Sequence, residues 1–156
     1  MIKKNQPTVY LGSDHAAFKL KESLHKYLTK IGYKVIDVGA FSDSPSDYPD
    51  YIIPTTEAAV TKKTVAIVMG KTGIGECIAA NKVHGARAAL VYDIYTARLS
   101  REHNNANVLC LGSQTTTKDF SLTKRIVKAW LQTTFSKAIR HKRRLKKIQN
   151  YEKGRY

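Results

Sequence analysis

Residues 64–82 read TVAIVMGKTGIGECIAANK, an apolar run that opens into a glycine-rich loop carrying a single acid, Glu76. The run 65–69 is continuous and mostly β-branched, which is typical of a strand buried on both faces of a parallel sheet. Ligands of open α/β sheets bind beyond the carboxyl ends of the strands. Glycines in such a loop leave backbone N–H groups free to approach an anion. The loop glycines are Gly70, Gly73 and Gly75. We therefore expect this loop to be the reaction centre.

Two familiar glycine motifs do not fit the loop. Gly70, Lys71 and Thr72 resemble the tail of a Walker A loop, but that motif requires a glycine where the chain has Val65. The spacing of the glycines also fails the dinucleotide pattern G-x-G-x-x-G. The pattern alone leaves two readings open, an anion held near a helix start and a tight strand-to-helix turn without a ligand.

The composition predicts one domain, residues 1–156, with a core that needs neither disulfides nor metals. The hydrophobic content of 42% and the mean hydropathy of −0.37 fit a soluble globular protein. We see no signal peptide, no stretch long enough to span a bilayer and no set of zinc ligands. The two cysteines, Cys77 and Cys110, lie outside any CxxC motif, which favours a reduced, cytoplasmic setting.

The net charge of +15 is concentrated in a basic tail. Residues 137–156 contain nine Lys or Arg and one acid, Glu152, so they contribute +8 and the preceding residues +7. Such a tail can bind nucleic acid, an acidic membrane or small phosphates, or it can be a solvated helix face. We expect residues 136–156 to form a helical arm that leaves the body of the domain.

Strands and helices alternate along the chain. Predicted strands are residues 8–11, 33–38, 65–69, 88–92 and 108–112, and predicted helices are residues 16–32, 52–61, 78–83, 93–103, 118–133 and 136–151. This order predicts an α/β fold, a doubly wound, Rossmann-like parallel sheet of about five strands flanked by helices. Right-handed crossovers then place four segments along one sheet edge. They are Asp14-His15, the Ser/Asp-rich loop 39–51, the glycine loop and Gly112-Ser113.

Four motifs in order resemble a known family. GSDHAAF (12–18), SDYPDY (46–51), GKTGIGECIAANK (70–82) and SREHNNANVLCLGS (100–113) look like the successive motifs of ribose-5-phosphate isomerase type B and its relatives, the galactose-6-phosphate isomerase subunits. The resemblance runs from about residue 9 to residue 151. It implies a homodimer that interconverts an aldose and a ketose phosphate through a cis-enediolate, without metal or organic cofactor. It also implies a site between subunits, reached by the partner's basic C-terminal helix.

The resemblance assigns the catalytic base to Glu76. One branch of the family uses a cysteine at the position that is Gly70 here, and the other uses a glutamate at the position of Glu76. The chemistry agrees, because one base must move a proton between adjacent carbons and a carboxylate in a dry pocket has a raised pKa. The alternative is a glutamate that only complements the helix dipole. Cys77 matches no catalytic position, and we interpret it as a small buried hydrophobe.

Further roles follow from the resemblance. Backbone N–H groups of residues 71–75, with the Thr72 hydroxyl, are candidates to stabilise the enediolate oxygen. Asp14 and His103 are assigned to opening the sugar ring, and which of them acts as the acid and which as the base is left open. Their alternatives are a helix N-cap and a histidine at a helix C-terminus. Asn104 is assigned to sugar hydroxyls and Tyr48 to the pocket wall.

The phosphate is assigned to His15 and, from the partner chain, to Arg140 and Arg144. These arginines lie one helical turn apart, and planar guanidinium groups suit a phosphate. Three positions depart from the family pattern. They are Ala17 in place of glycine, Lys71 in place of a small residue, and Gln114 in place of an arginine.

The main hypothesis is a ribose-5-phosphate isomerase of the pentose phosphate pathway, acting on a small sugar phosphate as a cytoplasmic homodimer. Pairing of dimers is left open, and we expect neither a membrane nor a nucleic-acid partner. Within the same chemistry, the alternative is an isomerase of galactose 6-phosphate or another hexose 6-phosphate, or one subunit of it. From another class, the alternative is an RNA-binding protein that uses the basic tail, although no stacking platform is visible.

Overall fold

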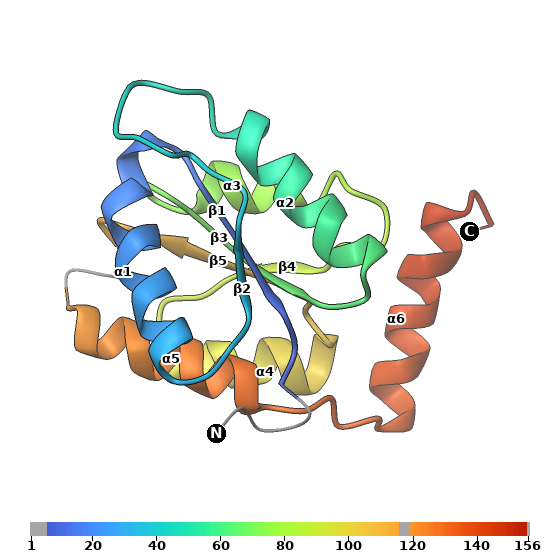
Figure 1. The fold of residues 1–156 in the computed structure, drawn as a ribbon. Helices are drawn as coiled ribbons and strands as arrows, with labels where there is room; N and C mark the ends of the chain where they lie inside the picture. The colour runs from blue at the N-terminus through green and yellow to red at the C-terminus, as the bar shows by residue number, and fades with distance from the viewer. Residues whose placement is uncertain (1–5, 116–118, 156) are drawn as a thin grey trace.

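Five parallel strands form a single sheet in the order β2-β1-β3-β5-β4 (Figure 1). The computed structural model describes residues 6–115 and 119–155. The strands are β1 (Val9–Ser13), β2 (Val35–Asp37), β3 (Val65–Gly70), β4 (Ala88–Leu90) and β5 (Val108–Gly112). Because β3 lies at the centre, with neighbours on both sides, the predicted apolar run is the middle of the sheet.

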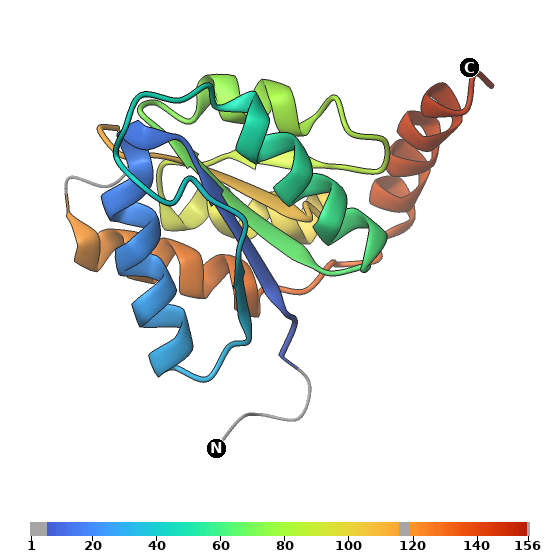
Figure 2. The same ribbon diagram turned by 45° about the horizontal axis from the view of Figure 1, so that its top comes forward.

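Helices cover both faces of the sheet, as Figures 1 and 2 show. They are η1 (His15–Ala17), a short 3-10 helix, then α1 (Phe18–Lys30), α2 (Pro49–Thr61), α3 (Ile74–Ala80), α4 (Ile94–Asn104), α5 (Phe120–Gln132) and α6 (Ile139–Glu152). Residues of α1, α4 and α5 share one apolar cluster, and residues of α2 and α3 share the other. The doubly wound α/β fold is therefore confirmed.

The side chains of β3 explain why its sequence is apolar without alternation. Val65, Ile67 and Met69 belong to the cluster under α1, α4 and α5. Ala66 and Val68 belong to the cluster under α2 and α3. Since both faces are covered, every position of the strand is buried.

Most predicted element boundaries differ from the structure by a few residues, and one differs for a structural reason. The helix predicted over residues 78–83 is α3, and it begins four residues earlier, at Ile74. Gly73 is its N-cap in a left-handed conformation, with φ of 80°, which only glycine adopts at low cost. Glu76 therefore lies in the first turn of the helix and not before it. Lys118, the predicted start of the fifth long helix, falls outside the described residues.

A buried ion pair holds the start of the Ser/Asp-rich loop. Lys21 of α1 is fully buried and contacts the carboxylate of Asp37 at the end of β2. The other oxygen of Asp37 accepts a hydrogen bond from the Gly39 N–H at 2.9 Å. Gly39 and Ala40 in turn pair with Ser13 at the end of β1, at 2.7 Å each. The loop is thus tied to the edge of the sheet where strands β1 and β3 end.

The C-terminal helix α6 stands beside the domain and not over either face of the sheet (Figures 1 and 2). Its long apolar side chains are largely exposed, with Ile139 at 84% and Tyr151 at 70%. His141 is the buried residue of this helix. In the parts of the chain that the structure describes, no helix has the length and apolar character needed to cross a membrane.

Candidate active site

The ends of β1, β3 and β5 meet at one edge of the sheet. The Asp14 N–H donates to the Met69 carbonyl at 3.3 Å, and the Ser113 N–H donates to the Gly70 carbonyl at 2.8 Å. The next residues continue this contact, because the Gln114 N–H donates to the Lys71 carbonyl at 3.0 Å. The predicted gathering of these segments at one edge is therefore confirmed. At this edge the chain after β1 passes to one face of the sheet and the chain after β3 passes to the other face. Ligands of open α/β sheets usually bind at such a point.

Glu76 is buried at this edge and rests on Gly70. The residue is 4% exposed, and a Cβ atom placed on Gly70 would overlap Oε1 and Cδ of its carboxyl group. Burial raises the pKa of the Glu76 carboxyl above its ordinary value, and the charge of Asp14 adds to this. The N–H groups of Glu76 and Gly73 act in the opposite direction. The result is a carboxylate that holds a proton more readily than usual, as a general base near neutrality requires.

Asp14 lies next to this base at the end of β1. It is 7% exposed, and its Oδ1 accepts a hydrogen bond from the Ala17 N–H at 3.2 Å. Asp14 is therefore the N-cap of η1. Its charge also raises the pKa of Glu76, so the two carboxyl groups lie within electrostatic reach of each other. The capping alternative is confirmed, and the role of Asp14 in ring opening stays a prediction.

The glycine loop presents backbone amides next to Glu76. The Thr72 hydroxyl accepts a hydrogen bond from the Ile74 N–H at 3.3 Å. Among the residues that the structure describes, no acceptor is found for the N–H groups of Lys71 and Thr72. Two unused donors at the mouth of a site can stabilise a developing oxyanion. Gly73 has no space for a side chain, because a Cβ there would lie 2.7 Å from Leu90 Cδ1.

His15 and Tyr48 approach the same edge from two sides. The His15 Nδ1 lies 3.1 Å from both the backbone N and O of Ser46, which leaves Nε2 to face a ligand. Tyr48 precedes α2, and its ring lies over Gly75, where a Cβ would be 3.0 Å from Cζ. The loop 39–51 thus supplies both the support of His15 and one wall beside the base.

Four predicted residues lie elsewhere. His103 and Asn104 end α4, and the Asn104 carbonyl accepts a hydrogen bond from Arg87 Nε at 3.1 Å, just before β4 begins. Arg140 and Arg144 lie on α6, which contacts α4. All four are therefore at the amino edge of the sheet. The five residues of β5 alone separate the two edges by roughly 13 Å, so one chain does not bring these four residues to Glu76.

Sequence reasoning missed His141, which lies between the two arginines on α6. It is 3% exposed, and its ring contacts that of His103, with 4.3 Å between the ring centroids. The available signal was a histidine inside a run of Lys and Arg, but a charge run usually indicates a solvated face. The contact with α4 became visible only in three dimensions.

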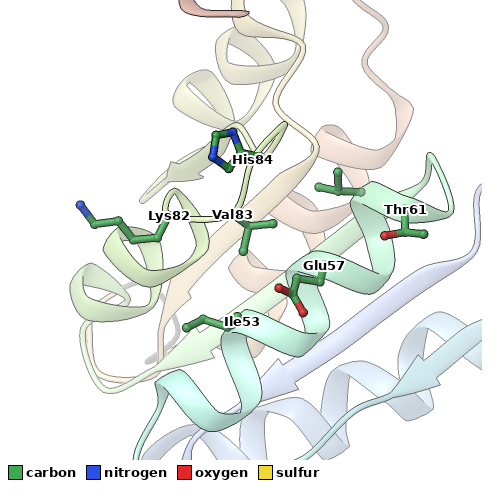
Figure 3. A pocket seen from close by; sticks show the side chains of 7 residues that line it. Ile53, Glu57, Thr61, Lys82, Val83 and His84 are labelled. Atoms are coloured by element: carbon green, nitrogen blue, oxygen red, sulfur yellow. The ribbon is translucent and has the colours of Figure 1, made fainter. Parts of the chain in front are cut away.

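A separate hollow of about 460 Å³ lies against α2, away from its Tyr48 end (Figure 3). Ile53, Glu57 and Thr61 of α2 face Val83 and His84, which lie in the segment between α3 and β4. None of the predicted site residues lines it. We therefore do not place the reaction there.

A parallel α/β sheet with a buried carboxylate, a second acid and free loop amides at its carboxyl edge defines a class of protein, an α/β enzyme of small anionic substrates. The comparison with family models makes this specific. Residues 9–148 match the family described as Ribose/Galactose Isomerase. The chain belongs to this family.

Named relatives and solved structures agree. The ribose-5-phosphate isomerase B of Mycolicibacterium paratuberculosis is 46% identical over 147 residues, 93% of this chain and 91% of that protein. The ribose-5-phosphate isomerase B structure from Clostridium thermocellum is 41% identical, with a TM-score of 0.90 over 96% of this chain and 99% of the other. The enzyme of Mycoplasma genitalium, solved with bound ribulose 5-phosphate, is 38% identical, with a TM-score of 0.87 over 94% and 96%.

Proposed function

We propose that this protein interconverts ribose 5-phosphate and ribulose 5-phosphate, with Glu76 as the base. The observation that carries the proposal is the buried carboxylate of Glu76 beside Asp14 at the carboxyl edge of the sheet, in a chain that matches the Ribose/Galactose Isomerase family. Several relatives are named ribose-5-phosphate isomerase B, and one is solved with ribulose 5-phosphate. These names favour a pentose phosphate over the hexose 6-phosphate alternative.

The reaction requires little beyond the residues at the carboxyl edge. Glu76 removes a proton from C2 of the open-chain aldose to give a cis-enediolate and returns it to C1. The O2 hydroxyl proton passes to O1, so that C2 becomes the carbonyl carbon and C1 the hydroxymethyl carbon. The N–H groups of Lys71 and Thr72 stand ready to hydrogen-bond the oxygen that becomes negative. His15, whose Nδ1 is engaged by Ser46, offers Nε2 to the phosphate. No step in this sequence calls for a metal or an organic cofactor.

The opposite edge supplies the second half of the site in this proposal, from a partner chain. His103, Asn104, Arg140 and Arg144 gather around α4 and α6 of the same chain, too far from its own Glu76. A homodimer in which α6 reaches across would join the two halves. Large apolar side chains are exposed on the elements involved, as expected of a surface that meets a partner. They include Ile74, Ile78, Tyr95 and Ile139.

The reaction is tested with purified protein and ribose 5-phosphate, beside the Glu76→Gln variant. Glutamine keeps the size and hydrogen bonding of the side chain but cannot accept the proton, so kcat should fall ~10²–10⁴-fold. Cys77→Ala is the matched control and should stay active, since the Cys77 thiol packs against the apolar cluster and donates to the Ala88 carbonyl at 3.6 Å. Unchanged turnover in Glu76→Gln would remove the assignment of the base. Activity on galactose 6-phosphate alone would select the hexose alternative.

Assembly is tested by sedimentation of the intact chain and of a chain ending at residue 135. We expect a dimer for the intact chain and no sugar-phosphate turnover for the shortened one. Both cysteines are free thiols, which agrees with the cytoplasmic setting that we propose for the enzyme. A monomeric, fully active intact chain would contradict the shared site.

A further inference from the structure

His141 is held rigidly against His103. The two ring planes are inclined by 38°, with 4.3 Å between centroids. On its other side, His141 Nδ1 lies 2.8 Å from Ser136 Oγ. The Ser136 N–H donates to the Glu102 carbonyl at 3.0 Å, so the segment before α6 is itself anchored to α4. Ser136 therefore fixes the ring of His141, and the ring of His141 covers one side of His103.

The surroundings of His141 disfavour the charged form of its ring. Burial lowers the pKa of His141, and His103 of α4 with Arg140 and Arg144 of its own helix lowers it further. Glu102 acts in the opposite direction. An uncharged His141 ring packs against His103 without charge repulsion. The side chain of His103 is still 37% exposed, so it remains accessible to a ligand.

We propose that His141 is a positioning residue that orients the imidazole of His103 for opening the sugar ring. The proposal rests on the proposed function. In ring opening, the anomeric hydroxyl loses a proton, the bond between C1 and the ring oxygen breaks, the ring oxygen gains a proton and C1 becomes a carbonyl. His103 can carry that proton only if its imidazole is aimed at the ring. Because His141 lies between Arg140 and Arg144 on α6, it links the predicted phosphate-binding helix to this step.

Ring opening is needed in one direction only, and this makes the proposal testable. Ribose 5-phosphate is mostly a furanose in water. Ribulose 5-phosphate has no free 5-hydroxyl to close a five-membered ring on C2, so it reaches the enzyme open. Its aldose product can leave open and cyclise in solution. Because the equilibrium constant fixes the ratio of kcat/KM for the two directions, the asymmetry appears in kcat. A residue that acts only on ring opening must slow the turnover of saturating aldose and spare the turnover of saturating ketose.

The experiment compares kcat at saturation for ribose 5-phosphate and for ribulose 5-phosphate in His141→Ala. We expect a loss of ~10–100-fold for the aldose, because His103 loses its fixed orientation, and a change within about threefold for the ketose. Ser136→Ala should show the same asymmetry, more weakly, since it removes the hydrogen bond and keeps the ring. His141→Phe, which keeps an aromatic ring against His103, should retain more aldose activity than His141→Ala.

His84→Ala is the control, since it removes an exposed histidine from the segment between α3 and β4. Equal losses of kcat for the two substrates in His141→Ala, His141→Phe and Ser136→Ala would give His141 only a structural role and overturn the proposal. Unchanged kinetics in all three would overturn it as well. If His141→Ala does not fold, His141→Phe and Ser136→Ala decide. Wild-type protein inactive on both pentose phosphates would instead overturn the proposed function, and this proposal with it.

Discussion

The carboxylate of Glu76 occupies the space that a side chain at residue 70 would need, because a Cβ on Gly70 would overlap Oε1 and Cδ of Glu76. A side chain at position 70 therefore requires the Glu76 carboxylate to leave the position that it holds in this structure. The resemblance describes two branches of the family, with a cysteine at one position or a glutamate at the other. The overlap gives a physical reason why a chain carries one of the two.

Gly70→Cys should therefore lower both the stability and the activity of the protein, although it adds a residue that serves as the base in the other branch of the family. The new Cβ must displace the Glu76 carboxylate, so we expect a lower Tm and a loss of kcat of roughly 10²-fold. Adding Glu76→Ala to the same chain should restore part of the lost Tm, since it removes the atoms in conflict. Glu76→Ala alone completes the double-mutant cycle and is the control. Tm values that simply add would show that the two positions do not compete.

The pH dependence of turnover should report the environment of Glu76. The base must be deprotonated, and burial raises its pKa, so kcat/KM should fall as pH drops through a value above that of an ordinary glutamate. Asp14→Asn removes the neighbouring charge that also raises this pKa. The acid limb of that variant should move to lower pH, whatever happens to its maximal rate. Glu57→Gln, an exposed acid on α2, should leave the limb in place.

The raised pKa also carries a cost in stability. A carboxyl group whose pKa is higher in the folded state than in the unfolded state destabilises the folded state when it is ionised. The free energy of unfolding therefore falls as pH rises from the unfolded-state pKa to the folded-state pKa. Glu76→Gln should therefore raise Tm at neutral pH while it abolishes turnover. The two Tm values should converge below the pKa of an ordinary glutamate. A Tm gain that is independent of pH would point to packing instead of ionisation.

Two departures from the family pattern lie side by side, which predicts a measurable weakness in phosphate binding. Gln114 stands where the resemblance expects an arginine, and its N–H donates to the carbonyl of Lys71 at 3.0 Å. Gln114→Arg adds a guanidinium at the carboxyl edge, so KM for the sugar phosphate should fall several-fold, most clearly at low salt. Gln114→Met is the neutral control. An unchanged KM in the arginine variant would mean that residue 114 does not face the phosphate.

The sequence was sufficient for the order of strands and helices and for one half of the candidate site. A continuous apolar strand followed by glycines determines both a central strand and its ligand edge, so residues 70–76 and Asp14 could be placed in advance. The start of α3 was misplaced, because the left-handed conformation of Gly73 is a local backbone choice with no periodicity. The separation of His103 from Glu76 was not predicted, although a helix that connects two parallel strands must end at the amino edge of the sheet. His141 was missed because its burial depends on contact with α4.

Mixing two inactive variants should test whether one site is built from two chains. Glu76→Gln disables the carboxyl edge, and Arg140→Ala with Arg144→Ala disables the opposite edge. In a mixed dimer, one shared site carries both defects and the other carries neither. Random re-pairing would make half of the dimers mixed, each with one intact site, so activity should recover to about a quarter of wild type. If each chain contained its own complete site, every site would keep one defect, and the mixture would stay as inactive as its parents.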